Sequence, residues 1–475
     1  MSDRGLHTYL NDHPFPRDRA THPKEAAFRW DSLTSFLSRG LSFWWFDHGW
    51  IFTIPPPFVA PNDTSSYGKF PGPWEGLTSE VWGSHIYYDT MRRFKIASPP
   101  APPNRPPERP LTLSRNGGTN WRPGMSNTIV NGVAAHHRYP VWRNGDGVPI
   151  LGSISSMVDE SVHDLRPFVH SDCGAIETNA TAMLRWTAHC VLGTILRFED
   201  ITLPWLYDNA TQAVIRRYLE MRYALAPSLI AAGRKTQHRG LPLAARCDLF
   251  WPDHDAARSN TQYMSTFADA LVAPLNETQM SRSVWIPPGT WEEAWSGASV
   301  VGPRVVHVTK PWGQIPMWHR VGAALVITTD CKALRIAAQD WRQLTIHAWP
   351  ASGAATTSKE LYFNDSTYMS VALESDVSGG IQVRGTARAD RGTAAAAARA
   401  WLLRLHLPLH ARLSGASVQG ATLVSPLRHL APGRDCAEHF PFAGAGATPA
   451  CDAGTIVEIE IQADAPGWSV RATIS

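Results

Sequence analysis

The stretch LSFWWFDHGW, residues 41–50, decides the expected fold of the first half of this 475-residue chain. Leu41–Phe46 has the apolar character of a buried strand, and Asp47 follows directly where that strand would end. Five aromatic side chains and a histidine surround this single carboxylate in the sequence. Asp47 is therefore either a capping or turn residue or a reactive group, and the patterns on either side bear on that choice.

The combination of a short apolar run and a polar end recurs along the first half. Further strands are predicted at Leu6–Leu10, Leu111–Leu113 and Phe168–Val169, with Asn11-Asp12, Ser114-Arg115 and His170-Ser171-Asp172 after them. Helical patterns lie between and after them, at Phe28–Leu37, Met183–Leu192 and, as one long amphipathic helix, Thr211–Ala232. Strands that alternate with helices predict a parallel sheet, and polar strand ends are typical of the active face of a (β/α)8 (TIM) barrel. The alternative, an open doubly wound sheet, has no glycine-rich phosphate loop here to support it.

The pattern changes near residue 236. Short strand-like runs at Ser283–Ile286, Val305–Val308 and Leu325–Ile327 are separated by Pro/Gly turns. Trp401–Leu407 ends in strict alternation, and Ile456–Ile461 largely alternates apolar residues with Glu. A period of two residues predicts antiparallel β-sandwich domains in the second half, so the fold class is α/β followed by all-β.

Charge and cysteine content exclude several functional classes. With 44 Lys and Arg against 41 Asp and Glu, the net charge of +3 gives no argument for nucleic acid or a membrane surface as partner. No secretory signal is visible at the N-terminus, although a truncated start could have lost one, so localisation and oligomeric state stay open. The six cysteines include no CxxC pair, which argues against a zinc cage, and a Cys436–Cys451 bridge is one alternative. His136, His137 and His170 suggest a metal cluster, but ordinary loop or core histidines fit their spacing better.

Six segments, in order along the chain, resemble glycoside hydrolase family 31, the α-glucosidase family. They are WWFDHGW (44–50), HHRYPVWRNGDG (136–147), RPFVHSDCGAIE (166–177), RRYLEMRYALAPSLI (216–230), DALVAPL…SRSVWIPPGTWEEAWSG (269–297) and IPMWHRVGA (315–323). The resemblance implies a barrel over residues 1–235 that begins at about its third strand, a proximal β-domain over 236–335 and a distal β-domain over 336–475.

The resemblance also implies roles for individual residues. Asp47 corresponds to the nucleophile and Asp146 to the acid/base of a retaining α-glycosidase, most simply one that removes terminal α-linked glucose from an oligosaccharide or glycoside. The other implied site residues bind the sugar in the −1 subsite: Asp12, Arg115 and Asp172, Trp45 as an aromatic wall, and Glu199 at the end of the last barrel strand. No cofactor and no metal are expected, because two carboxyl groups suffice for this chemistry.

The sequence departs from the family pattern at three points. The chain is expected to begin near the third barrel strand, Thr119–Asn131 looks inserted ahead of the acid/base segment, and Glu199 stands where the family usually has histidine. An ionised Glu cannot donate a hydrogen bond to a sugar hydroxyl and adds negative charge near two carboxylates. The competing hypothesis is therefore a catalytically impaired relative that acts as a carbohydrate-binding or scaffold protein.

Overall fold

A computed structural model describes the chain in two compact units, one comprising residues 1–145 and 166–170 and the other residues 146–165 and 171–475. The residues it describes are 34–41, 44–46, 94, 112–114, 141–143, 150–163, 168–170, 173–174, 179–193, 196–198, 202–362, 367–389, 400–407, 411–430, 455–463 and 467–474. All statements below concern these residues.

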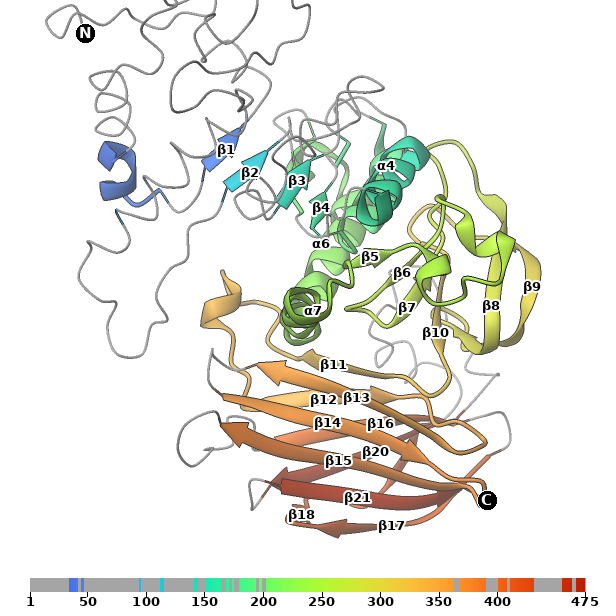
Figure 1. The fold of residues 1–475 in the computed structure, drawn as a ribbon. Helices are drawn as coiled ribbons and strands as arrows, with labels where there is room; N and C mark the ends of the chain where they lie inside the picture. Colours follow the sequence, from blue (N-terminus) through green and yellow to red (C-terminus); the bar gives the residue numbers. More distant parts are fainter. Residues whose placement is uncertain are drawn as a thin grey trace, which may run out of the picture. The chain divides into compact units, whose positions relative to one another are not determined.

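The described part of the first unit contains a four-stranded parallel sheet (Figure 1). Its strands lie in chain order: β1 (Trp44–Phe46), β2 (Thr112–Ser114), β3 (Val141–Arg143) and β4 (Val169–His170). The predicted strands that end near residues 46, 113 and 169 are thus confirmed as members of one parallel sheet. The strand predicted at Leu6–Leu10 lies outside the described residues.

Helices open the second unit: α4 (Ile150–His163), α5 (Ala180–Cys190), the 3-10 turn η6 (Pro204–Leu206), α6 (Asn209–Ala224) and α7 (Ala226–Arg239). The single helix predicted over Thr211–Ala232 is wrong, because the chain divides at Leu225 into α6 and α7. Pro227 explains the division. It has no N–H to continue the hydrogen-bond ladder, and a proline fits only in the first turn of a helix, where it stands in α7.

The proximal β-region is an antiparallel sheet in the order β5-β6-β7-β10-β8-β9. Its strands are β5 (Ala244–Ala245), β6 (Tyr263–Ser265), β7 (Ala270–Val272), β8 (Ser281–Glu293), β9 (Ser299–Thr309) and β10 (Met317–Arg320), with 3-10 turns η7 (Cys247–Leu249) and η8 (Asp255–Arg258) between β5 and β6. Trp291, Ile286 and Trp318 lie at the centre of its apolar core. The predicted strands at Ser283–Ile286 and Val305–Val308 are parts of the β8–β9 hairpin.

The distal β-region consists of two sheets that pack face to face (Figure 1). One has the order β11-β12-β16-β20-β18, with β19 also on β20, and the other has the order β13-β14-β15-β21-β17. The elements are β11 (Ala324–Thr328), η9 (Ile336–Ala338), β12 (Gln343–Ala348), β13 (Ala355–Tyr362), β14 (Thr367–Ser375), β15 (Gly380–Ala389), β16 (Ala400–Leu407), β17 (Leu413–Gln419), β18 (Ala421–Leu423), β19 (Arg428–Leu430), β20 (Thr455–Ala463) and β21 (Gly467–Ile474).

Alternation in the sequence accounts for the core of this sandwich. In β16 the residues Trp401, Leu403 and Leu405 are buried, whereas Leu402 and Arg404 between them are only partly buried. Trp401 meets Trp468 of the opposite sheet with ring centroids 5.3 Å apart. The sandwich predicted from the period of two is therefore confirmed, with the difference that β12 and β16 pair parallel and not antiparallel.

Arg185 of α5 fastens the helices to the proximal sheet. Its guanidinium donates hydrogen bonds to the carbonyl oxygens of four residues and lies over the ring of Trp312 at 4.9 Å. The four acceptors are Gln279, Lys310, Pro311 and Gln314. Burial lowers the pKa of Arg185 to about 10, so the group still carries its charge at neutral pH.

A stack of rings joins the proximal and distal sheets. Trp349 lies between His319 of β10 and His406 of β16, with ring centroids 4.2 Å and 4.5 Å away. The Glu292 carboxylate of β8 accepts a hydrogen bond from Trp349 Nε1 at 2.8 Å and lies 3.3 Å from His406 Nδ1. Burial, and then the nearby His406, lower the pKa of His319 to about 3, so His319 is neutral in the folded chain.

Candidate functional site

The carboxyl edge of the parallel sheet is the candidate site, because predicted residues follow its strands in sequence. Asp47 comes directly after β1 and Arg115 directly after β2. Asp146 comes three residues after β3, and Asp172 two residues after β4. In the parallel register Phe46 pairs with Ser114, and Arg143 with His170, so these strands end at one edge of the sheet. The strand ends that precede these four candidate residues in the sequence therefore lie at one edge of the sheet.

Trp45 is the one predicted site residue whose backbone is described. It is the middle residue of β1 and pairs with Leu113 of β2. The remaining predicted site residues lie outside the described residues: Asp12, Asp47, Arg115, Asp146, Asp172 and Glu199. The segment Thr119–Asn131 and the pair Cys436 and Cys451 also lie outside them.

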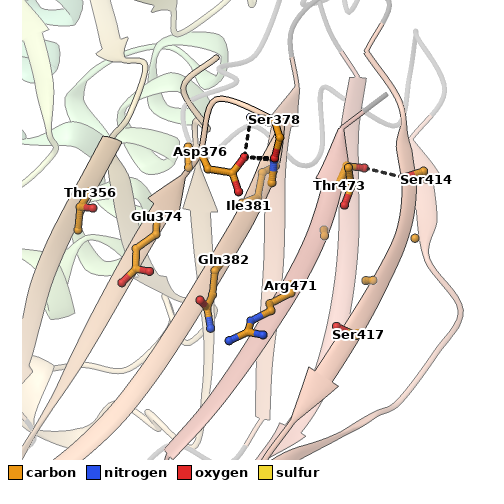
Figure 2. Close-up of a pocket in the computed structure, with 15 residues that line it drawn as sticks. Thr356, Glu374, Asp376, Ser378, Ile381, Gln382, Ser414, Ser417, Arg471 and Thr473 are labelled. Carbon is orange, nitrogen blue, oxygen red and sulfur yellow. Dashed lines mark hydrogen bonds between the residues drawn. The ribbon is translucent and has the colours of Figure 1, made fainter. Parts of the chain in front are cut away.

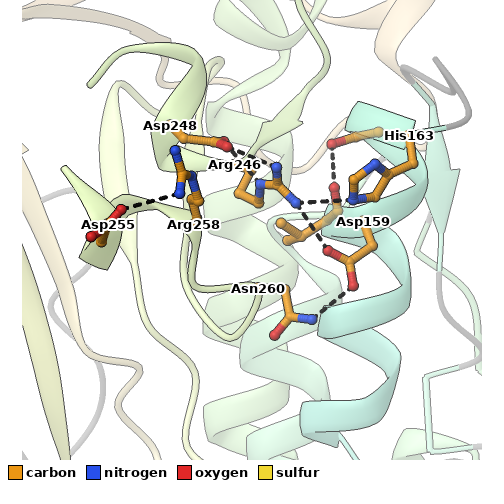
Figure 3. A network of polar contacts seen from close by, with 9 residues as sticks. Asp159, His163, Arg246, Asp248, Asp255, Arg258 and Asn260 are labelled. Carbon is orange, nitrogen blue, oxygen red and sulfur yellow. Dashed lines mark hydrogen bonds and ion pairs between the residues drawn. The ribbon is translucent and has the colours of Figure 1, made fainter. Parts of the chain in front are cut away.

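Helix α4 begins four residues after Asp146 and is anchored near both ends. The backbone N–H of Ile150 donates to Glu277 Oε1 at 2.5 Å, which places a carboxylate at the positive end of the helix. Near the other end, Asp159 accepts hydrogen bonds from Arg246 at 3.4 Å and from Asn260 at 2.7 Å (Figure 3). The chain that leaves Asp146 thus enters a fixed helix.

The charged side chains around Arg246 pair with one another. Its guanidinium makes a two-pronged contact with the Asp248 carboxylate, at 2.9 Å and 2.7 Å, and also lies 3.2 Å from the ring nitrogen of His163 (Figure 3). The hydrogen bond from Arg246 lowers the pKa of Asp248, and the same bond raises the pKa of Arg246. Because its charges are compensated within the network, this cluster acts as a clamp for α4 and not as a centre for chemistry.

A disulfide fixes the residue that follows Asp172. Cys173 is bonded to Cys190 at the end of α5, with the two Cα atoms 5.9 Å apart. Asn179 caps the start of the same helix, since its side-chain oxygen accepts from the N–H groups of Thr181 and Ala182. The only bridge suggested by the sequence was between Cys436 and Cys451, so the Cys173–Cys190 bridge was not predicted. Its signal was the position of Cys173 beside a candidate site residue, with a partner 17 residues later.

Arg222 of α6 is a second positioning residue that sequence analysis missed. Its guanidinium donates to the carbonyl oxygens of Val191, at 2.9 Å, and Gly193, and lies over the ring of Phe267. Burial lowers its pKa to about 10. These bonds hold the segment after α5, which leads along the chain toward Glu199.

The described residues contain neither a group of metal ligands nor a helix suited to span a membrane. No three His, Cys, Asp or Glu side chains among the described residues are grouped closely enough to hold a metal ion. Nor does any described helix combine the length and the apolar character that crossing a membrane requires.

Comparison with known proteins gives three kinds of match. Residues 240–325 match the model of the glycosyl hydrolase family 31 C-terminal domain. The chain is 23% identical to alpha-glucosidase 2 of Bacillus thermoamyloliquefaciens over 199 residues, which are 41% of this chain and 24% of that protein. It is 25% identical to an alpha-xylosidase of Saccharolobus solfataricus over 239 residues, which are 46% of this chain and 31% of the relative. The matches therefore span between a quarter and a third of the length of these curated relatives.

Among solved structures, the fold is similar to that of the GH31 dextranase of Flavobacterium johnsoniae, solved in complex with glucose. The TM-score is 0.71 at 16% identity, and the superposition covers 97% of this chain and 57% of the dextranase. At that identity the likeness concerns the fold alone.

Proposed function

We propose that this chain is a retaining α-glycosidase of glycosyl hydrolase family 31 that acts on terminal α-linked glucose in an oligosaccharide or glycoside. The observation that carries the proposal is the order of candidate residues after consecutive parallel strands, with Asp47 after β1 and Asp146 shortly after β3. In a barrel, residues at that edge converge on one site. The proposal includes a partial (β/α)8 barrel over residues 1–235, followed by β-domains over 236–335 and 336–475.

The proposed mechanism uses two carboxyl groups in turn. The Asp47 carboxylate attacks the anomeric carbon while the Asp146 carboxylic acid gives its proton to the leaving oxygen, which forms a glycosyl ester on Asp47. Asp146, now ionised, then removes a proton from water, and the water displaces Asp47 with a second inversion. The product keeps the α configuration. A retaining site needs the two carboxyl groups about 5–5.5 Å apart.

The other candidate residues would bind the sugar that is cleaved. Asp12 and Asp172 would accept hydrogen bonds from sugar hydroxyls, and Arg115 would donate to them through its planar fork. Trp45 would give the ring an apolar wall. Glu199 would accept hydrogen bonds where the family usually has histidine, and so would alter the preference of the subsite.

Turnover of a chromogenic substrate tests the proposal. The purified chain and its Asp47→Asn variant are incubated with a nitrophenyl α-glucoside, and with the α-xyloside because one relative is an alpha-xylosidase. We expect release of nitrophenol by the parent and a loss on the order of 10³-fold or more in the variant, since the nucleophile is removed. Proton NMR of the first product should show the α anomer. Binding of glucoside without any turnover would contradict the proposal and support a scaffold role, and a β anomer would exclude the retaining mechanism.

A further inference from the structure

The distal sandwich carries a polar groove on the outer face of the sheet β13-β14-β15-β21-β17 (Figure 2). Its volume is about 760 Å³. All the residues that line it come from the strands of this one sheet and the β14–β15 turn, so the groove is built within a single domain. The labelled polar side chains on the strands in Figure 2, such as Glu374, Gln382 and Arg471, point out from the sheet, whereas Ile381 belongs to the core that the two sheets share.

A row of polar side chains crosses the whole width of the sheet. The strand registers place one residue from each strand opposite the next: Thr356, Glu374, Gln382, Arg471 and Ser417. Because neighbouring strands lie about 4.8 Å apart, the row is about 19 Å long. All five residues line the groove, and Figure 2 shows them following one another across the strands. An extended ligand that lies across the strands would meet each of them in turn.

Small residues on β17 leave the groove open at one side. Ser414, Gly415, Ala416 and Ser417 are consecutive there, and Gly415 pairs with Thr473 of β21. A Cβ atom added at Gly415 would meet no other atom within 4 Å. The groove therefore has free space above β17 that a larger side chain would fill.

Two of the polar groups in the row are available to a ligand. Neither Arg471 nor Gln382 makes a side-chain hydrogen bond or ion pair with another described residue, whereas Glu374 pairs with Arg384. Asp376, at the rim, is already used: its carboxylate accepts from Ser378 N, Ser378 Oγ and Gly380 N and so shapes the β14–β15 turn. The groove thus offers a guanidinium and an amide, flanked by a carboxylate and hydroxyls.

This set of groups selects a class of ligand. An anion would meet the Glu374 carboxylate, and a cation would meet Arg471, so neither charge is favoured along the row. A chain of hydroxyl groups fits, because each hydroxyl both donates and accepts a hydrogen bond and the row offers donors and acceptors side by side. We propose that the groove is a second carbohydrate-binding site, which holds a neutral oligosaccharide across the strands of the distal sandwich. The choice of an α-glucan as ligand rests on the proposed function.

Calorimetric titration with maltoheptaose tests this site. The titrations use the full chain carrying Asp47→Asn, so that the sugar is not consumed, with and without Arg471→Ala plus Gln382→Ala. A third protein carries Gly415→Trp, which fills the groove. Loss of a charged and a neutral hydrogen bond should weaken binding at the groove at least about tenfold, and the tryptophan should abolish it. Arg304→Ala is the matched control, because Arg304 is an exposed arginine on β9 of the other β-region.

The outcomes separate this site from the catalytic proposal. Maltoheptaose binding that is equal in the parent, the double variant and the Gly415→Trp variant, or absent in the parent, overturns the groove site. Equal weakening by Arg304→Ala does so as well, because the effect would not be local. Nitrophenyl glucoside turnover reports on the catalytic proposal alone, since so small a substrate does not need the groove. Thermal unfolding midpoints confirm that each variant is folded.

Discussion

The parallel sheet of the first unit and the distal sandwich use β-structure in opposite ways. The strands β1–β4 have two or three residues each, and the candidate residues follow them. The strands β14 and β15 have nine and ten residues, and their buried side chains lie along their length. The short parallel strands serve mainly to position the segments that follow them. The long strands of the sandwich themselves supply the side chains of the core. Substitutions of the residues that follow the parallel strands should therefore change turnover. Substitutions in the sandwich core should change the free energy of unfolding.

The largest effect is expected at Asp146, as a loss of rate without a loss of fold. Asp146→Ala should lower turnover of an unactivated disaccharide such as maltose by about 10²–10⁴-fold, the usual contribution of a general acid. A nitrophenyl glucoside should suffer less, since its leaving group needs little protonation. Steady-state kinetics on both substrates measure the difference, with Asp255→Ala as control because the Asp255 side chain is 97% exposed. Equal losses on the two substrates would contradict the role of Asp146 as the acid.

Trp401→Ala should produce the opposite result, a loss of stability with its origin in the sandwich core. The side chain is fully buried against Trp468, and removing so large a group from a core costs about 3–5 kcal/mol in the free energy of unfolding. Urea unfolding followed by circular dichroism measures this. Trp205→Ala is the matched control, since Trp205 is 67% exposed and should change stability by less than about 0.5 kcal/mol. Similar unfolding midpoints for the two variants would refute the packing argument.

The smallest effect concerns two buried histidines outside the parallel sheet. Burial lowers the pKa of His189 to about 4 and that of His319 to about 3, whereas both titrate near 6.5 in the unfolded chain. Between these values the unfolded chain binds more protons, so the free energy of unfolding falls as the pH drops below about 6.5. From pH 7 to 5.5 the two groups together should cost roughly 2.5 kcal/mol.

Urea unfolding at several pH values checks this dependence. His319→Phe removes one titrating group and keeps a ring against Trp349. It should therefore remove about half of the slope of the free energy of unfolding against pH. His307→Gln is the matched control, because His307 is an exposed histidine on β9. A urea midpoint that stays constant between pH 7 and 5.5 would contradict the prediction that two buried neutral histidines lower the stability at acidic pH.

Some parts of the fold could be predicted from the sequence and others could not. The alternation in Trp401–Leu407 predicted the sandwich because only one face of a strand contacts the core. Three of the four described parallel strands could be located because each is a short apolar run with a polar end, whereas β3, with the sequence VWR, was not predicted. The division at Leu225 was missed because the apolar spacing continues through it. Pro227 interrupts the hydrogen bonds of the backbone but leaves the spacing of the apolar residues unchanged.

The candidate site, too, could be predicted from the sequence only in part. Asp47 and Asp146 could be singled out from their segments and from their resemblance to a family, but the groups that support the site could not. The contact of Arg246 with Asp159 joins residues 87 positions apart, and nothing in their local sequence marks the partner; the Cys173–Cys190 bridge had only the weak signal of a cysteine beside a candidate residue. The groove likewise depends on strand register, which brings Arg471 beside Gln382 although 89 residues separate them.

The contacts of Arg185 affect how this protein can be dissected. All four of the carbonyl groups that surround this cation belong to residues between 279 and 314. A fragment that ended near residue 235 would keep the cation on α5 and lose every one of these acceptors, together with the ring of Trp312. A buried ion left without partners is strongly destabilising, so such a fragment should aggregate or unfold around α5. Recombinant fragments are better ended after the proximal sheet than before it.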